Sequence, residues 1–175
     1  MQLIRYITRG LIDGSLSTLG IVLGAAISGD VKVIVAAGLG GGMANAISNL
    51  LGALTAEKAS VMIDLAEYER AMVGSKINLK DTKIYEKEKR KIWVGGITDA
   101  TATFFGSIVP IVPFGLLALD SAIIGSIVVT TALLFGLGLY MGRLSKENLV
   151  FAGIKMAVFG LVTAGLAMSL ELFFK

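Results

Sequence analysis

The feature that most constrains this chain is a set of five apolar segments, each long enough to cross a lipid bilayer. They cover residues 11–29, 31–54, 92–114, 118–141 and 149–172. A helix rises about 1.5 Å per residue, so about 20 apolar residues span the hydrocarbon region. We therefore predict an all-α, polytopic membrane protein with five transmembrane helices, in which residues 1–175 form a single transmembrane domain.

Charged residues are concentrated between the second and third apolar segments. Residues 57–91 hold nine of the 16 Lys and Arg residues and seven of the 13 Asp and Glu residues, although only 17% of the chain is charged. Helical periodicity from Ala56 to Val73, a break at Gly74-Ser75 and a second helical stretch from Asp81 predict a short helical hairpin over 56–91. The simplest interpretation of its mixed charge is a solvated surface.

The basic residues outside this hairpin predict the orientation of the chain. Arg5 and Arg9 precede the first segment, and Arg143 and Lys146 lie between the fourth and fifth. Because Lys and Arg are enriched in cytoplasmic loops, the N terminus and the 55–91 loop are expected in the cytoplasm and the C terminus outside. Short loops and the lack of a targeting sequence favour a prokaryotic plasma membrane. This topology also accounts for the net charge of +3, so nucleic acid is not an expected partner.

The chain has neither Cys nor His, which excludes several kinds of chemistry. Disulfides, thiolate metal sites, iron–sulfur clusters and Ser-His-Asp triads are all ruled out. A metal would have to bind carboxylate, amide, hydroxyl or backbone oxygens, which suit Mg, Ca, Mn or ferrous iron, or the softer thioether of Met.

Polar residues inside the predicted spans are the first candidates for function, because they are costly in a bilayer. The candidates are Asp13, Asn45, Asn49 and Asp99, with Met43 near the midplane. Counting at helical rise from the predicted cytoplasmic ends places Asp13, Asn49 and Asp99 roughly 6–12 Å deep, in one layer. Three helices would thus contribute oxygen atoms to a coordination site near the inner mouth of a pathway.

Each candidate also has a purely structural interpretation. Asp13 could cap the N terminus of a short first helix. Asp99 could be held by hydroxyl groups and neighbouring helices, Asn45 and Asn49 could bond only between helices, and Met43 could serve packing. Small residues in the first two spans allow close helix contact and could line a dimer seam or a pore: Gly20, Gly24, Gly38, Gly41, Gly42 and Gly52. Pro110 and Pro113 are interpreted as the end of the third helix.

The hairpin carries a second group of candidate ligands. Glu57, Asp64 and Glu67 share a helical face, and Glu86 and Glu88 lie on the other arm. Carboxylates on a helical hairpin can bind hard divalent cations, although the nine local cations oppose this. The sequence therefore predicts a weak metal site there, with a solvated connector as the alternative.

Three stretches resemble the vacuolar iron transporter family. The first runs from Gly10 through Asp13-Gly14 to Gly24, and the second is the Gly- and Ala-rich segment from Ala37 to Gly52. The third, Phe105-Gly-Ser-Ile-Val-Pro-Ile-Val-Pro-Phe114, is similar to the family's Gly-x-x-x-Pro-x-x-Pro-aromatic end of helix three. The order of five helices with one insertion after the second also agrees.

This resemblance implies a homodimeric exporter of ferrous iron, and often manganese, from the cytosol in exchange for protons. The metal would be cargo, and no resident cofactor is implied. Asp13 falls on the family's helix-one aspartate, which is implicated in metal and proton handling. The glutamate and methionine that the family often carries in helix two are replaced here by Gly41 and Asn49.

Two other functions remain open at this stage. A membrane scaffold could retain the fold without transport. An intramembrane aspartyl protease could use Asp13 and Asp99 as a pair sharing one proton. However, such proteases resemble Gly-x-Gly-Asp at one site, and this chain reads Gly96-Ile-Thr-Asp99. We therefore expect a divalent-cation/proton antiporter rather than an enzyme.

Overall fold

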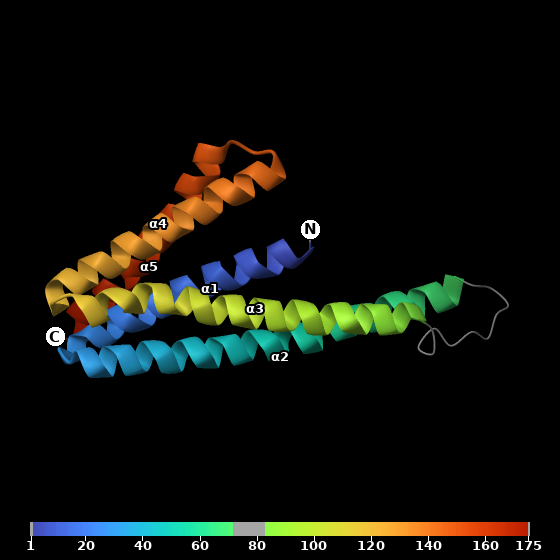
Figure 1. The fold of residues 1–175 in the computed structure, drawn as a ribbon, viewed down its shortest axis with the longest axis horizontal. Coiled ribbons are helices and arrows are strands. Elements are labelled where there is room, and N and C mark those ends of the chain that lie inside the picture. The colour runs from blue at the N-terminus through green and yellow to red at the C-terminus, as the bar shows by residue number, and fades with distance from the viewer. Residues whose placement is uncertain (1, 72–82, 175) are drawn as a thin grey trace.

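The computed structural model describes residues 2–71 and 83–174, which form five long helices (Figure 1). They are α1 (Gln2–Ala25), α2 (Val31–Ala71), α3 (Lys83–Leu116), α4 (Leu119–Ser145) and α5 (Leu149–Phe174), with a short 3-10 helix, η1 (Ala26–Ser28), after α1. All five contain a stretch long and apolar enough to cross a membrane. The prediction of an all-helical chain with five candidate membrane spans is confirmed.

Helix α1 begins earlier than the sequence suggested. It starts at Gln2 rather than near residue 11. Residues 2–9 contain neither Gly nor Pro, so the helix can extend toward the N terminus beyond the purely apolar stretch. Asp13 consequently lies in the middle of α1, and the interpretation of Asp13 as a helix N-cap is wrong.

The two prolines of α3 do not end that helix. Both Pro110 and Pro113 lie inside α3, which continues to Leu116. Prolines are tolerated in membrane helices when neighbouring groups satisfy the backbone that they disturb. The Ser126 hydroxyl of α4 donates to the Pro110 carbonyl at 2.8 Å and joins this part of α3 to α4, and the Leu117 N–H donates to the Pro113 carbonyl at 2.9 Å, so the helical pattern continues past both prolines. The turn before α4 therefore starts three residues later than the motif predicted.

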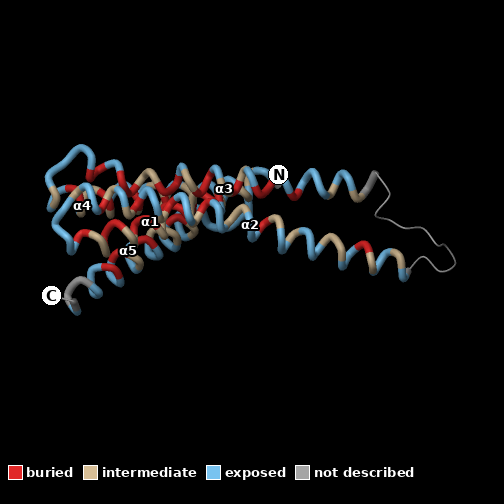
Figure 2. The backbone as a smooth tube through the Cα atoms, turned by 90° about the horizontal axis from the view of Figure 1, so that it is seen from below, coloured by how far each residue is buried: buried red, intermediate tan, exposed pale blue. Residues whose placement is uncertain are grey.

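The first three helices pack along one another, and α4 and α5 form a second pair. In Figure 1, α4 and α5 leave the other helices at an angle and rejoin them near the C terminus. One end of the bundle carries the N terminus, the α4–α5 turn and the extensions of α2 and α3. We call this the hairpin end. Figure 2 shows buried positions mainly where the five helices come together, with the hairpin mostly exposed.

Two apolar clusters hold the bundle together at the end opposite the hairpin. Val22, Ile34, Ile111 and Phe114 bring α1, α2 and α3 together beside Ala122 of α4. A second cluster joins α1 to α5, and it contains Leu19, Leu23, Ala164 and Ala167.

Helices α1 and α3 approach each other closely because glycines face the partner backbone. A Cβ atom on Gly106 would lie 2.6 Å from the Leu11 carbonyl oxygen, and one on Gly14 would overlap the backbone of Thr103. Ser107 Oγ reaches the Gly14 carbonyl at 3.3 Å. Small residues at such crossings let membrane helices pack backbone to backbone. This contact brings the polar groups of the two helices within hydrogen-bonding distance.

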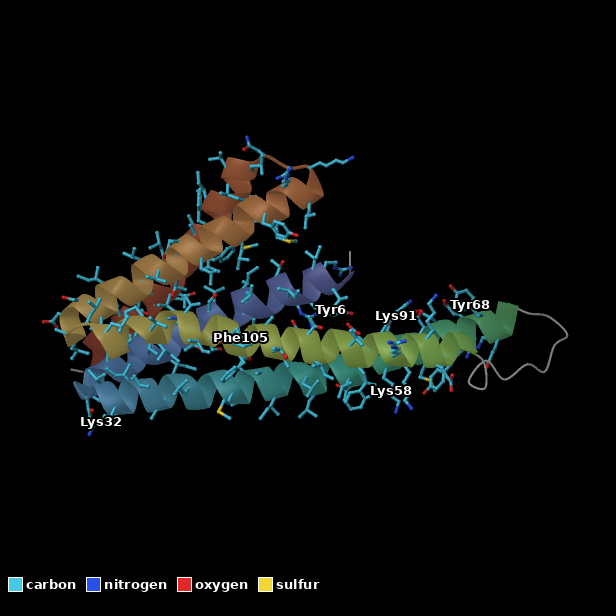
Figure 3. The ribbon with its side chains drawn as sticks, in the orientation of Figure 1. Tyr6, Lys32, Lys58, Tyr68, Lys91 and Phe105 are labelled. Atoms are coloured by element: carbon cyan, nitrogen blue, oxygen red, sulfur yellow. The ribbon has the colours of Figure 1, made fainter. Side chains whose placement is uncertain are left out.

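The extensions of α2 and α3 form the arms of the predicted hairpin. Helix α2 continues without interruption from its apolar part to Ala71, as predicted. Leu65 and Ile92 are buried, whereas Lys58, Tyr68 and Lys91 lie on the outside (Figure 3). The predicted break at Gly74-Ser75 and helix start at Asp81 fall outside the described residues.

Candidate functional site

A layer of polar side chains lies where α1, α2 and α3 meet. Asn45 Nδ2 and Asn49 Nδ2 of α2 both donate to Asp13 Oδ2 of α1, at 3.0 and 2.7 Å. The same two nitrogens also donate to Ser17 Oγ at 2.8 Å and to Thr103 Oγ1 at 2.9 Å. We call these five residues the Asp13 layer. Three separate helices therefore place a carboxylate, two amides and two hydroxyls together inside the candidate spans.

The partners within the Asp13 layer are neutral. Among the described residues, Asp13 Oδ1 and the side-chain carbonyl oxygens of Asn45 and Asn49 accept no hydrogen bond. Asp13 Oδ2 accepts both amide N–H groups, which leaves Oδ1 available to another partner. Rotation of the amide groups would turn two further oxygens toward Asp13. The layer thus contains the oxygen donors that a hard or borderline divalent cation requires.

Asp99 has a different partner from the one expected. Asp99 is 1% exposed. The Arg9 guanidinium donates two hydrogen bonds to its carboxylate, from Nε to Oδ1 at 3.2 Å and from Nη2 to Oδ2 at 2.5 Å. The hydroxyl of Thr98 donates to the Val94 carbonyl and that of Thr103 to the Asp99 backbone carbonyl. The part of the structural interpretation that assigns Asp99 to hydroxyl groups is therefore wrong, whereas the part that assigns it to a neighbouring helix is confirmed, because Arg9 of α1 pairs with it.

A second pair of contacts connects Arg9 to α2. The Arg9 guanidinium carbon lies 5.6 Å from the centre of the Tyr6 ring, and the Tyr6 hydroxyl donates to Glu57 Oε1 at 2.6 Å. The Arg9 guanidinium thus lies over the ring of Tyr6, and the Tyr6 hydroxyl is bonded to Glu57. Because Tyr6 is held by Glu57, the Arg9 side chain is restricted. Glu57, predicted as a hairpin ligand, thus lies beside α1.

A cavity of about 470 Å³ connects these groups at the hairpin end. It is lined by Arg5, Tyr6, Thr8, Arg9, Ile12, Asp13, Leu16, Glu57, Met141 and Met156. Figure 3 shows Tyr6 on the part of α1 that faces this end of the bundle. The cavity is large enough for a hydrated ion and reaches the carboxylates of both Asp13 and Glu57.

Two candidates on α2 lie away from the Asp13 layer. Met43 is 53% exposed and shares the outer surface of α2 with Ile47 and Leu51. A Cβ atom on Gly41 would meet Ile21 of α1. Because Asn45 and Asn49 face inward while Met43 faces outward, the structure does not bring Met43 together with Asp13 in this chain.

The hairpin carboxylates are not gathered into a cluster. Asp64, Glu67 and Glu86 are exposed, Glu88 pairs with Lys91, and Glu57 bonds to Tyr6. Within residues 2–71 and 83–174, no group of three or more acidic side chains is close enough to hold a metal ion. From Glu57 to Glu67 the helix rises about 15 Å, which is too far for one coordination sphere.

The glycines proposed for a seam divide into two groups. Gly38 and Gly42 pack inside the protein, against Val22 and Ser107 respectively, as Gly41 does against Ile21. Gly52 faces open space, as does Gly24 of α1. The outer face of α2 carries exposed small residues at intervals of four: Ala36, Gly40, Ala44, Ser48 and Gly52. The surface available to a second molecule is therefore this stripe rather than most of the predicted glycines.

Sequence reasoning missed several residues around the site. A first span that begins near residue 11 leaves Arg9 outside the membrane, where its charge serves only to orient the chain. Tyr6 was missed for the same reason, and Ser17 and Thr103 because single hydroxyls in a span are common. The spacing of four residues between Arg9 and Asp13 indicates that both lie on one face of α1, and both line the cavity.

Comparisons with known proteins agree with the fold and the helix order. The sequence model of the VIT family matches residues 53–171, which is more than half of the chain. An uncharacterized protein of Methanocaldococcus jannaschii is 47% identical over 167 residues, covering 95% of this chain and 87% of that protein. The family match begins after Asn49, whereas the archaeal relative extends over nearly the whole chain. The protein belongs to the VIT family, and this membership suggests a metal transporter.

Proposed function

We propose that the protein moves divalent metal ions, ferrous iron or manganese, across a membrane in exchange for protons. Membership of the VIT family suggests a metal transporter. The single observation that carries the assignment to particular residues is the Asp13 layer, in which two amides from α2 hold an intramembrane carboxylate at 3.0 and 2.7 Å. Ionisable groups within membrane spans mark ion and proton pathways.

Asp13 is the residue at which cation and proton would compete. A carboxylate binds either a proton or a metal ion, so occupancy by one releases the other, and no histidine is needed. Asn45 and Asn49 would contribute carbonyl oxygens after rotation of their amide groups. Competition for one group makes the binding of either ion oppose the binding of the other.

The proposed direction is export from the cytosol. The hairpin end carries Arg5, Arg9 and the basic residues of the two arms, together with Arg143 and Lys146 at the α4–α5 turn. The positive-inside rule assigns this end to the cytoplasm. The cavity at this end then supplies an entrance from the cytosol to Asp13 and Glu57. We place the protein in a prokaryotic plasma membrane.

We also propose that two copies associate through the outer face of α2. Ala36, Gly40, Ala44, Ser48 and Gly52 form a stripe in which every fourth residue is small and exposed. Repeated small residues at this spacing allow two membrane helices to approach closely. Cross-linking in native membranes tests this, and Gly40→Leu should reduce the dimer fraction. A strictly monomeric species at all lipid ratios would exclude the seam.

The protease alternative finds little support in the arrangement of the two aspartates. A protease pair requires carboxylates that share a proton. Asp13 bonds to Asn45 and Asn49, and Asp99 is paired with Arg9. The scaffold alternative would leave the Asp13 layer as an interhelical contact only. Transport measurements separate this alternative from the proposal.

The decisive experiment uses the purified protein in vesicles with an imposed pH gradient. Wild-type protein should move Mn²⁺ or Fe²⁺ and carry protons in the opposite direction. Asp13→Asn keeps an oxygen and the hydrogen-bonding size but removes the charge, so flux should fall to the level of empty vesicles. Its melting temperature should change little, because Asp13 is not a helix cap. Normal flux in Asp13→Asn would remove this residue from the mechanism.

A further inference from the structure

The ion pair between Arg9 and Asp99 bears directly on how Asp13 is reached. Asp99 is 1% exposed, whereas the Arg9 side chain is 57% exposed. A buried carboxylate is stable only with a compensating partner, and among the described residues that partner is Arg9. The two bonds between the guanidinium fork and the two carboxylate oxygens fix the direction of the arginine.

The exposed part of Arg9 faces the same cavity as Asp13. Both residues line the cavity of about 470 Å³, and both belong to α1. Residues four apart on a helix are neighbours, with their Cβ atoms about 6 Å apart. A guanidinium freed from Asp99 is therefore within reach of Asp13, whose Oδ1 accepts no hydrogen bond among the described residues.

An arginine paired with Asp13 would be a tethered competitor for any cation. It carries a permanent positive charge and cannot be deprotonated in a protein. Its fork would occupy the carboxylate that the cation and the proton must share. A cation would then have to displace an ion pair before it could bind.

We infer that Asp99 is a positioning residue that holds Arg9 away from Asp13 and so keeps the cation site open. This inference rests on the proposed function, because it assigns Asp99 a role in access to the same site. Tyr6 supports the position of Arg9 from the other side, with its ring 5.6 Å from the guanidinium and its hydroxyl on Glu57. Asp99 is then neither a ligand nor a proton carrier.

The close contact of α1 with α3 makes this arrangement possible. A Cβ atom on Gly10 would lie 2.8 Å from both Ala102 Cβ and Thr103 N. Gly10 follows Arg9 directly, so the absence of a side chain lets the α1 backbone approach α3 beside Asp99. A larger residue would move Arg9 away from its partner.

The test compares Asp99→Asn with the double variant Arg9→Gln/Asp99→Asn in Mn²⁺ flux assays. Asp99→Asn frees the arginine, so the KM for Mn²⁺ should rise about tenfold while kcat stays near the wild-type value. The double variant removes the competitor as well and should return KM to near wild type. Arg9→Gln alone would strand a buried charge, so the double variant is the one to use. Glu88→Gln, which frees Lys91 on the outer surface of α3, is the matched control and should leave KM unchanged.

Two outcomes would overturn the inference. If the double variant is as impaired as Asp99→Asn, then Asp99 itself acts on the ion. If Asp99→Asn has the wild-type KM, then Arg9 does not compete. Both outcomes presuppose flux in the wild-type protein, so absence of that flux counts against the proposed function instead.

A second measurement does not depend on transport. The starting protein is Asp99→Asn, and three further proteins add Arg9→Gln, Asp13→Asn or both of these substitutions to it. Thermal unfolding of these four proteins gives the coupling free energy between Arg9 and Asp13 when residue 99 is neutral. We expect a stabilising coupling free energy between Arg9 and Asp13 in this set. In the corresponding set of four proteins that retain Asp99, we expect a smaller coupling free energy. Equal coupling in both sets would show that Asp99 does not control the contact.

Discussion

The Asp13 layer and the helical hairpin use acidic residues in opposite ways. The hairpin arms hold many more charges, yet Asp64, Glu67 and Glu86 are exposed, Glu88 is paired with Lys91, and Glu57 is bonded to Tyr6. The layer has one carboxylate, but two amides and two hydroxyls from three helices surround it. Convergence of neutral oxygen and nitrogen groups, rather than charge density, distinguishes the better candidate site.

The difference follows from the surroundings of each region. In a span, a polar group without partners is costly, so the helices that contact Asp13 must supply them. On the hairpin, exposed side chains such as Asp64, Glu67 and Glu86 can be solvated by water, and nothing forces these carboxylates together against their mutual repulsion. The same residue type therefore indicates a site in one region and a solvated surface in the other.

The largest effect should come from separating the helices that build the layer. Gly14→Ala places a methyl group against the Thr103 backbone, which cannot move without shifting α3. We expect a loss of about 3 kcal/mol or more in stability, seen as a large fall in melting temperature or as failure to fold. Gly165→Ala, where nothing lies within 4 Å, is the matched control and should melt like wild type. Equal melting of both variants would contradict the close α1–α3 contact.

The sequence predicted the part of this site that depends on helix direction and depth. Asp13 and Asn49 lie at similar distances from the cytoplasmic ends of the predicted spans, and counting residues from those ends is enough to place them in one layer. The partner of Asp99 could not be found this way. Depth does not say which way a side chain points, and the early start of α1 at Gln2 changed Arg9 from a flanking residue into one within the span.

The glycines show a similar limit of sequence reasoning. Their small size predicted close helix contacts correctly. It could not separate those that face α1 and α3, such as Gly38 and Gly42, from Gly52, which faces outward. That distinction depends on the rotation of α2 about its own axis, which is set by packing of Ile34 and Ala46 against the other helices.

The next effect should come from removing one amide of the layer. Asn49→Leu keeps the approximate size but removes the donors to Asp13 and Thr103. We expect the apparent Kd for Mn²⁺ to rise about tenfold and the stability to fall by about 1 kcal/mol, the usual worth of interhelical hydrogen bonds in membranes. Thr55→Val on the same helix is the control, because its hydroxyl bonds to the Leu51 carbonyl of its own helix. Unchanged binding in Asn49→Leu would reduce the layer to a structural contact.

A smaller effect is expected at Glu57, which belongs to both regions. Glu57→Gln leaves an oxygen for the Tyr6 hydroxyl but removes a negative charge from the cavity. The KM for Mn²⁺ should rise about threefold with kcat unchanged, because the charge attracts the ion without being the final ligand. Glu67→Gln removes the same charge from an exposed position of α2 and should not alter KM. An equal effect at both positions would mean that only the overall charge of the hairpin end matters.

The smallest effect should come from the exposed acids of the hairpin. Asp64→Asn, Glu67→Gln and Glu86→Gln together remove three charges that are not part of any described metal cluster. Interactions of exposed charges are weak and are screened over about 8 Å at physiological salt. We therefore expect the Mn²⁺ flux of the triple variant to lie within about twofold of wild type. The ratio of variant flux to wild-type flux should not change when the salt concentration is raised. A loss of flux comparable to that of Asn49→Leu would show that the hairpin gathers metal before it reaches Asp13, and the contrast between the two regions would fail.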